Sequence, residues 1–275
     1  MIEEALATLA PLPRVLTLAV VQGLTEFLPV SSSGHLVLAE AMLGMRSDGM
    51  RVEIALHFGT LLAVFAVYGR DLLRLAVGGV TGKPRDLLWL VVATIPAVVV
   101  GLLLKDRIEG AFGSPRGAAT GLVITAVVLL TGDFLRRRRA ARSPGTERAE
   151  ADFTDALVIG CAQAFALLPG VSRSGSTISA GLARGLRPDV AARLSFLMSV
   201  PAILGACVLM LPDLADAPQE GVGTGLLALG VLAAGVVGWL ALRLLLSFLG
   251  RGVFRVFAVY CALLGLGALA FLALR

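Results

Sequence analysis

Residues Gln22–His35 read QGLTEFLPVSSSGH and interrupt an apolar segment with an amide, a carboxylate, three consecutive serines and an imidazole. Such groups are costly in the hydrocarbon core of a membrane, where they usually mark a functional site. A second stretch, residues 163–177, reads QAFALLPGVSRSGST and repeats the pattern with Arg173 in place of the middle serine. We therefore predict that the two stretches meet in the folded chain and form one site.

The composition of the chain is that of a membrane protein. Its 275 residues are 57% hydrophobic and 16% charged, whereas a soluble domain carries about 25% charged residues. The alternating apolar and polar pattern of a β-barrel is absent from the sequence. We predict an all-α integral membrane protein. The net charge of +5 then bears on orientation in the membrane and does not indicate nucleic-acid binding.

Six apolar segments approach the length of about 20 residues that a helix needs to cross a bilayer. They are residues 52–69, 86–104, 117–135, 190–211, 222–243 and 253–274. Shorter apolar pieces flank each of the two polar stretches. A short helix, a polar break and a second short helix are typical of a re-entrant hairpin, whose break must line a protein-enclosed or watery cavity. The prediction is therefore six transmembrane helices plus two re-entrant helical hairpins.

The chain also divides into two halves of the same plan within a single membrane domain of residues 1–275. Residues 1–135 form the first predicted repeat, residues 136–152 a basic linker and residues 153–275 the second repeat. A shift of 141 positions places Gln22 on Gln163 and Ser31 on Ser172 without a gap. The matching order of segments favours duplication.

The distribution of basic residues predicts the orientation. Sixteen of the 24 Lys and Arg residues fall in four connecting segments, residues 70–86, 136–152, 184–193 and 243–255. An excess of this kind is typical of cytoplasmic loops. The first hairpin then enters the membrane from outside and the second from the cytoplasm. We therefore expect an inverted-topology repeat, whose broken helices usually meet near the midplane.

The second polar stretch has the features of an anion site. Pro169-Gly170 ends one helix, and the hydroxyl side chains that follow are suited to cap the next. A helix N-terminus attracts anions, and Arg173 adds a guanidinium whose shape fits phosphate oxygens. An alternative is that Arg173 pairs with Glu26 only to tie the halves together. We favour an anion site that includes this pair when empty.

The first polar stretch contributes the remaining chemistry. Gln22 and Glu26 share one helix face because they are four residues apart. Glu26 is a suitable ligand for a hard divalent cation. His57 lies one turn from Glu53 on the first long segment, as part of a polar stripe that we expect to face the bundle interior, with a supporting role in the site as the alternative. A carboxylate, an imidazole, a guanidinium and hydroxyls together suit phosphoryl transfer.

Both stretches resemble the motifs of the undecaprenyl-pyrophosphate phosphatase family, also called bacitracin-resistance proteins. The resemblance is carried by QGLTEFLPVSSSGH and LPGVSRSGST, and it extends to VEIALHFGTLLAV (52–64), TIPAVVVGLLLKD (94–106) and LSFLMSVPAILGA (194–206). Members often carry Glu at the position of Gln22, to which we therefore assign a supporting role. Members also often carry an amide at the position of His57.

The resemblance implies hydrolysis of undecaprenyl pyrophosphate to undecaprenyl phosphate and inorganic phosphate, which recycles the lipid carrier of cell-envelope glycans and gives bacitracin resistance. It also implies a divalent cation, Mg²⁺ or Ca²⁺, and a site that opens to the periplasmic side of the bacterial inner membrane. The catalytic residues it implies are Glu26, which is also the metal ligand, Ser32, His35 and Arg173. The phosphate-binding residues it implies are Ser31, Ser33, Ser172, Ser174 and Thr177.

Two questions stay open at this point. Phosphorus can be attacked by His35, by Ser32 or by an activated water. The rival function is an inverted-repeat secondary transporter or a polyprenyl-lipid flippase, because transporters often share this architecture. The expected partners are a polyprenyl pyrophosphate lipid and the surrounding membrane lipid, and a homodimer is compatible with them.

Overall fold

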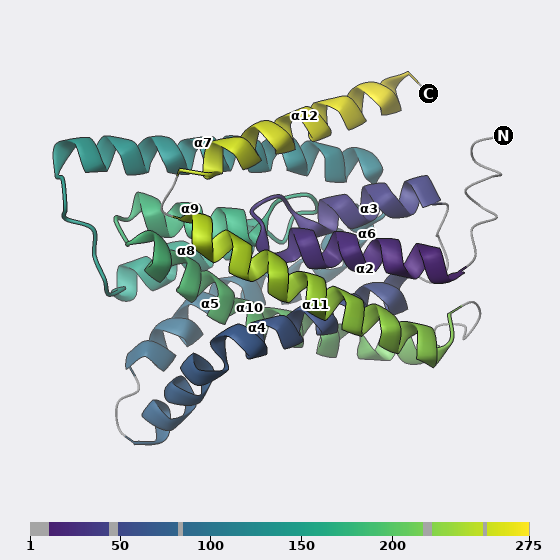
Figure 1. Cartoon of the computed structure of the whole chain (residues 1–275), viewed down its shortest axis with the longest axis horizontal. Coiled ribbons are helices and arrows are strands. Elements are labelled where there is room, and N and C mark those ends of the chain that lie inside the picture. Colours follow the sequence, from purple (N-terminus) through teal and green to yellow (C-terminus); the bar gives the residue numbers. More distant parts are fainter. Residues whose placement is uncertain (1–10, 44–48, 82–84, 217–221, 250–251, 275) are drawn as a thin grey trace.

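The computed structural model describes residues 11–43, 49–81, 85–216, 222–249 and 252–274, and within these ranges it is helical, with one isolated β-bridge between Arg148 and Leu186 (Figure 1). The helices are α2 (Pro11–Phe27), α3 (Ser32–Leu43), α4 (Gly49–Val80), α5 (Arg85–Leu103), α6 (Lys105–Phe112), α7 (Pro115–Arg142), α8 (Phe153–Phe165), α9 (Arg173–Ala183), α10 (Pro188–Asp216), α11 (Thr224–Phe248) and α12 (Phe254–Ala273).

Among the described helices, six are long and apolar enough to cross a membrane: α4, α5, α7, α10, α11 and α12. Their outer faces carry large apolar side chains, such as Leu103 on α5 and Leu263 on α12, which are 76% and 70% exposed. Such faces are matched to hydrocarbon, where helices satisfy their own backbone hydrogen bonds. The predicted all-α membrane class and its six long segments are confirmed.

Some helix bounds differ from those expected. Helix α4 continues to Val80, and α7 continues through the arginine run to Arg142. The predicted linker, residues 136–152, therefore begins as the last turns of α7. Helix α6 was not expected, because its sequence KDRIEGAF is short and half of its residues are charged. Alanine, leucine, arginine and lysine are all good helix formers, so a helix can extend past its apolar part into water.

The long helices enclose the two short pairs α2–α3 and α8–α9. Helix α11 packs along α2 and α4, helix α5 packs along α8 and α10, and α12 lies along α7. Figure 1 shows α2 and α3 extending from the centre toward one end of the bundle, and α8 and α9 toward the other. The connections within the two pairs therefore meet at the centre of the molecule.

Aromatic packing fixes the inner end of α2. Phe27, the last residue of α2, contacts Phe196 of α10 edge to face, with 5.8 Å between ring centroids. Tyr68 of α4 packs on the same phenylalanine at 6.0 Å. Phe27 and Phe196 are fully buried, and such aromatic pairs add to the free energy gained by burial alone. The residues that follow Phe27 are thus held against the core.

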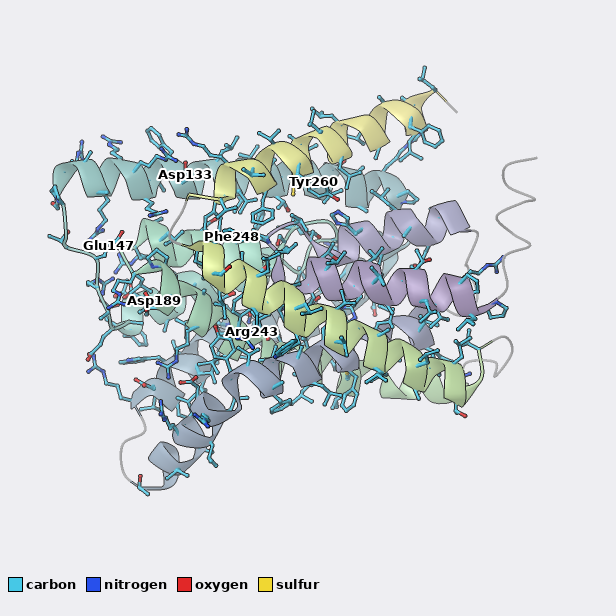
Figure 2. All side chains as sticks on the ribbon, viewed as in Figure 1. Asp133, Glu147, Asp189, Arg243, Phe248 and Tyr260 are labelled. Atoms are coloured by element: carbon cyan, nitrogen blue, oxygen red, sulfur yellow. The ribbon has the colours of Figure 1, made fainter. Side chains whose placement is uncertain are left out.

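Two carboxylates tie the chain together at the end of the bundle that holds the basic linker. Asp155 of α8 is fully buried and pairs with Arg148 at 2.7 Å and with Arg184 at 2.8 Å. Asp133 of α7 accepts hydrogen bonds from Arg137 and Arg255, each at 2.8 Å. Side chains of both signs are dense at this end in Figure 2. The second pairing anchors the start of α12 on α7.

Candidate active site

Two loops at the centre of the bundle carry the site. The first loop, residues 28–31, joins α2 to α3, and the second loop, residues 166–172, joins α8 to α9. Helix α2 ends before Pro29, which lacks a backbone N–H. Ser31 has a φ angle of 71°, and Gly170 in the second loop has 81°. Positive φ is uncommon for a residue other than glycine and is concentrated at functional sites.

Each loop ends in the same helix cap. The Oγ atom of Ser31 accepts the N–H of Gly34 at 3.2 Å, and the Oγ atom of Ser172 accepts the N–H of Gly175 at 3.0 Å. A serine oxygen on a free N–H in the first turn is a common N-cap. In each cap the first serine also contacts the serine two residues on: Ser31 with Ser33 at 3.3 Å, and Ser172 with Ser174 at 3.2 Å.

The two loops are in direct contact. The Oγ atom of Ser33 accepts the N–H of Gly170 at 3.3 Å, and the hydroxyl of Ser174 donates to the carbonyl of Leu28 at 3.1 Å. A Cβ atom on Gly34 would lie only 3.0 Å from the Cα atom of Gly170, so the two backbones approach closely here. The prediction that the two polar stretches meet in the folded chain is therefore confirmed.

Helix α7 supports the second loop through Thr125. The hydroxyl of this threonine donates to the carbonyl of Gly170 at 2.9 Å and accepts the N–H of Ser172 at 2.9 Å. Thr125 is 1% exposed. Buried backbone groups need hydrogen-bond partners, and the Thr125 side chain is the partner of two such groups in the second loop.

At the meeting point Glu26 and Arg173 form an ion pair. An Nη atom of Arg173 donates to Oε1 of Glu26 at 2.7 Å. Ser32 donates to Oε2 at 2.6 Å, and the Nε2 amide of Gln22 donates to the same oxygen at 3.1 Å. Glu26 is 7% exposed and Gln22 is fully buried. A buried carboxylate is stable only when it is paired and hydrogen-bonded, and these three donors meet that need.

Helix α10 fixes the other side of Arg173. The second Nη atom of Arg173 donates to the carbonyl of Ser195 at 3.2 Å. The hydroxyl of Thr177, one turn further along α9, lies 2.6 Å from the hydroxyl of Ser195 and also bonds the carbonyl of Arg173 at 2.8 Å. The guanidinium is thus held on two sides before any ligand binds.

His35 lies on α3 and contacts residues other than Glu26. Its Nδ1 atom is 2.7 Å from the carbonyl oxygen of Ser31, and its Nε2 atom is 2.8 Å from the hydroxyl of Tyr260. Tyr260 belongs to α12 and is labelled in Figure 2. The two rings are nearly parallel, at 8°, with centroids 5.6 Å apart.

Several residues of the site were not expected from the sequence. Thr125, Ser195 and Tyr260 are among them. His57, which we expected to belong to a polar stripe facing the bundle interior, also lies close to Glu26. The Nε2 atom of His57 lies 3.8 Å from Oε2 of Glu26, so the polar stripe of α4 does reach the site. A polar residue inside an apolar helix is the signal that could have singled out Thr125 and Ser195.

The oxygen atoms beside Glu26 fit a divalent cation. In the ranges that the structure describes, no cluster of three or more His, Cys, Asp or Glu side chains is arranged to hold a metal. However, among the residues that the structure describes, the Oε1 atom of Gln22 is buried without a hydrogen-bond partner, on the amide whose Nε2 atom donates to Glu26 at 3.1 Å. Mg²⁺ typically takes one or two carboxylates and completes its shell with water and substrate phosphates.

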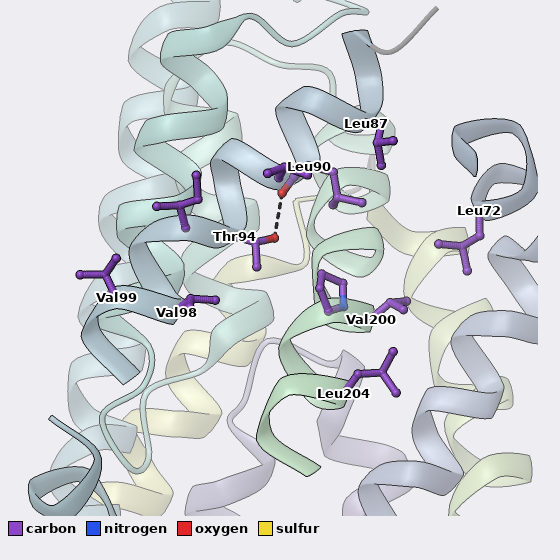
Figure 3. A pocket seen from close by; sticks show the side chains of 11 residues that line it. Leu72, Leu87, Leu90, Thr94, Val98, Val99, Val200 and Leu204 are labelled. Carbon is purple, nitrogen blue, oxygen red and sulfur yellow. Dashed lines mark hydrogen bonds between the residues drawn. The ribbon is translucent and has the colours of Figure 1, made fainter. Parts of the chain in front are cut away.

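Two apolar pockets lie outside this polar centre. The larger, of about 440 Å³, lies between α4, α5 and α10 and is lined by aliphatic residues and Thr94 (Figure 3). The smaller, of about 260 Å³, lies between α5, α6 and the second loop, and Leu167 and Leu168 form part of its wall. Neither lining contains a charged residue. Both suit hydrocarbon and not a diphosphate.

Comparison with known proteins identifies the family. Residues 15–267 match the model of the family described as bacitracin resistance protein BacA. The chain belongs to this family. A protein of Gemmatimonas aurantiaca named undecaprenyl-diphosphatase is 44% identical over 95% of this chain and 98% of its own length. Proteins of the same name from Rubrobacter xylanophilus and Moorella thermoacetica are 43% and 41% identical over 90% and 91% of this chain, and over 93% and 94% of their own lengths.

The family match covers both polar stretches and every predicted site residue. The resemblance expected from QGLTEFLPVSSSGH and LPGVSRSGST is therefore confirmed. It also extends through α12 to residue 267, so Tyr260 lies inside the family region. The roles of the individual residues stay predictions.

Thr125→Val is expected to destabilise the protein by about 2–4 kcal/mol, because it leaves the carbonyl of Gly170 and the N–H of Ser172 buried without a partner. The measurement is the midpoint of thermal unfolding in detergent. Thr120→Val is the matched control on the same helix, because Thr120 is exposed and bonds only the carbonyl of Arg116. Equal midpoints for the two variants would contradict the bridging role of Thr125.

Proposed function

We propose that this protein hydrolyses undecaprenyl pyrophosphate to undecaprenyl phosphate and inorganic phosphate. The observation that carries the proposal is the buried carboxylate of Glu26, which contacts both Arg173 and Ser32 where two helix N-termini meet. Membership of the family, whose relatives are named undecaprenyl-diphosphatase, supports the same reaction. By that reaction the protein would recycle the lipid carrier and confer bacitracin resistance.

Arg173 and the two helix N-termini would bind the diphosphate. The carboxylate of Glu26 occupies the guanidinium in the arrangement described here. A phosphate brings oxygens of the same charge and similar spacing, and it can replace or share that carboxylate as the partner of Arg173. The N-terminal turns of α3 and α9 add the positive ends of their dipoles. The predicted phosphate-binding serines shape these two turns.

The hydroxyl of Ser32 is arranged to be activated by Glu26. It donates to Oε2 of the carboxylate at 2.6 Å, which is the geometry of a nucleophile beside its base. Ser32, or a water held in its place, would give its proton to Glu26 as its oxygen attacks the terminal phosphorus. The bond from that phosphorus to the bridging oxygen then breaks, and undecaprenyl phosphate leaves. Where Ser32 is the nucleophile, water then hydrolyses the phosphoserine, which releases inorganic phosphate and restores the serine. His35 is the alternative nucleophile or base.

A divalent cation, Mg²⁺ or Ca²⁺, would be held by Glu26 with the free amide oxygen of Gln22. When bound, it neutralises charge on the diphosphate and so lowers the barrier to attack. The apolar pocket beside Leu167 and Leu168 provides a place for the first isoprene units of the lipid, because these residues directly precede the Pro169-Gly170 turn of the site.

The proposed membrane topology is an inverted repeat with two re-entrant hairpins. Its support is the pairing of helices: α11 packs on α2 and α4 of the first half, as α5 packs on α8 and α10 of the second. The identical caps at Ser31 and Ser172 also support it. The basic linker lies on the cytoplasmic side of the inner membrane in this proposal, and the site opens to the periplasmic side.

Arg173→Ala is expected to lower phosphate release from a polyprenyl diphosphate by at least about 1,000-fold, because it removes the cation that holds the anion. The assay uses purified protein in detergent with Mg²⁺. Arg187→Ala is the control, since the side chain of Arg187 forms an exposed pair with Asp189. If the unsubstituted protein releases no phosphate but moves lipid between compartments, the transporter is the correct function. If Arg173→Ala releases phosphate as fast as Arg187→Ala, the site assignment is wrong.

Removal of divalent cations with EDTA is expected to abolish phosphate release, and added Mg²⁺ or Ca²⁺ to restore it. Glu26→Gln should raise the concentration of cation that gives half-maximal rate by about tenfold or more, because a neutral amide is a weaker ligand than a carboxylate. Glu147→Gln is the control, because Glu147 is exposed on the linker. Full activity in EDTA would refute the cation.

Thr146→Cys, placed on the exposed linker in a variant whose own cysteines are replaced by alanine, is expected to resist a membrane-impermeant maleimide in intact cells. Gly113→Cys, placed at the exposed turn before α7, is expected to react. The two positions lie at opposite ends of α7, and the basic linker should be inside. The reverse labelling pattern would reverse the proposed orientation.

A further inference from the structure

Tyr260 is the polar residue of α12 that reaches the site, and the proposed function gives it no role. Its hydroxyl lies 2.8 Å from Nε2 of His35. Its side chain is 45% exposed, so the ring is not a buried packing element. Its neighbour Cys261 is fully buried and packs on the first loop, with Sγ 4.0 Å from the carbonyl of Pro29 and 3.9 Å from that of Val30.

The contacts of His35 determine which of its nitrogens carries the proton. The Nδ1 atom lies 2.7 Å from the carbonyl oxygen of Ser31. A carbonyl oxygen only accepts hydrogen bonds, so Nδ1 must be the donor and must carry a hydrogen. In the neutral ring the lone pair is then on Nε2, and the hydroxyl of Tyr260 donates to it. The second hydrogen bond of a histidine commonly sets its tautomer and orientation in this way.

We propose that Tyr260 is a positioning residue, which holds the His35 ring in one orientation and covers its Nε2 lone pair until substrate binds. This inference rests on the proposed function, because the covered nitrogen is the one that would face a phosphate. When a diphosphate binds, the tyrosine hydroxyl would turn from Nε2 and donate to a phosphate oxygen, and the freed Nε2 lone pair would face the terminal phosphorus or the proton of an attacking water.

The position of Tyr260 is itself fixed. The start of α12 is anchored on α7 by the hydrogen bond of Arg255 to Asp133, at 2.8 Å. From there α12 lies along α7, and Cys261 is seated on the first loop that carries Ser31. The hydroxyl of Tyr260 is therefore held in place relative to the carbonyl of Ser31, which is the other contact of His35. A tyrosine that only anchored α12 in the membrane would need neither the 2.8 Å contact nor the nearly parallel rings.

The test is Tyr260→Phe, which keeps the ring and removes only the hydroxyl. In phosphate release from a polyprenyl diphosphate, kcat should fall by about five- to tenfold, the effect of losing one oriented hydrogen bond. KM should stay within about twofold, because a lower kcat at constant KM marks an interaction that matters in the transition state. A residue that serves only packing would lose nothing, because phenylalanine fills the same space.

A second readout follows His35 directly. Diethyl pyrocarbonate reacts with an uncovered imidazole lone pair, and the chain has 2 histidines, which peptide mass spectrometry separates. In Tyr260→Phe the reaction of His35 with diethyl pyrocarbonate should be about fivefold faster, because the hydrogen bond from the tyrosine hydroxyl to Nε2 is lost. His57 is the internal control, because its contacts are with Glu53 and Glu26, and its rate should not change.

The proposal is overturned if kcat in Tyr260→Phe stays within about twofold of the unsubstituted protein. It is also overturned if kcat falls while His35 reacts at its original rate, because the loss would then not act through His35. Absence of phosphate release from the unsubstituted protein would refute the proposed function instead, and the modification rates of His35 would still test the hydrogen bond.

Discussion

The structure depends on one buried ion pair between Glu26 and Arg173, which are contributed by different halves of the chain. Neither charge is tolerable alone at this depth, because removing one partner of a buried pair leaves the other uncompensated. The partners that stabilise the pair come from several elements: Ser32 on α3, Gln22 on α2 and the carbonyl of Ser195 on α10. The long helices must therefore bring four elements to one point. Helix α11 packs on α2, and α5 packs on α8 and α10.

The serines around the pair have a structural task, and the phosphate binding that their motif suggests stays a prediction. Each N-capping serine uses its Oγ atom on the first turn of its own helix, and each serine two residues on contacts the opposite loop. These hydroxyls therefore shape the loops first. In the proposed function, the N-terminal turns of α3 and α9 and the guanidinium of Arg173 bind the phosphate. This division of tasks explains why serines accompany a single arginine.

Much of this arrangement follows from local patterns. Long apolar runs predicted the six spans, and Pro29, Pro169 and Gly170 predicted the breaks, because proline and glycine act on the backbone at their own positions. The contacts of Tyr260 had no such signature, and the signal of Thr125 was only its polarity inside an apolar helix. Tyr260 is 225 residues from His35, and nothing in its neighbourhood distinguishes it from an ordinary lipid-facing tyrosine. The extension of α7 to Arg142 was also not predicted, because a run of exposed arginines can either continue a helix into water or follow its end.

Thr125 belongs to the first half of the chain but holds the loop of the second, and this has a consequence for biogenesis. When the ribosome has completed α7, Glu26 is in place and its countercharge has not been synthesised. Until Arg173 emerges, the carboxylate must be hydrated or protonated, because an isolated charge is not stable in a dry interior. Thr125 is meanwhile a ready-made docking point for residues 170–172. The electrostatic cost of the first half is thus relieved only when Arg173 has been synthesised.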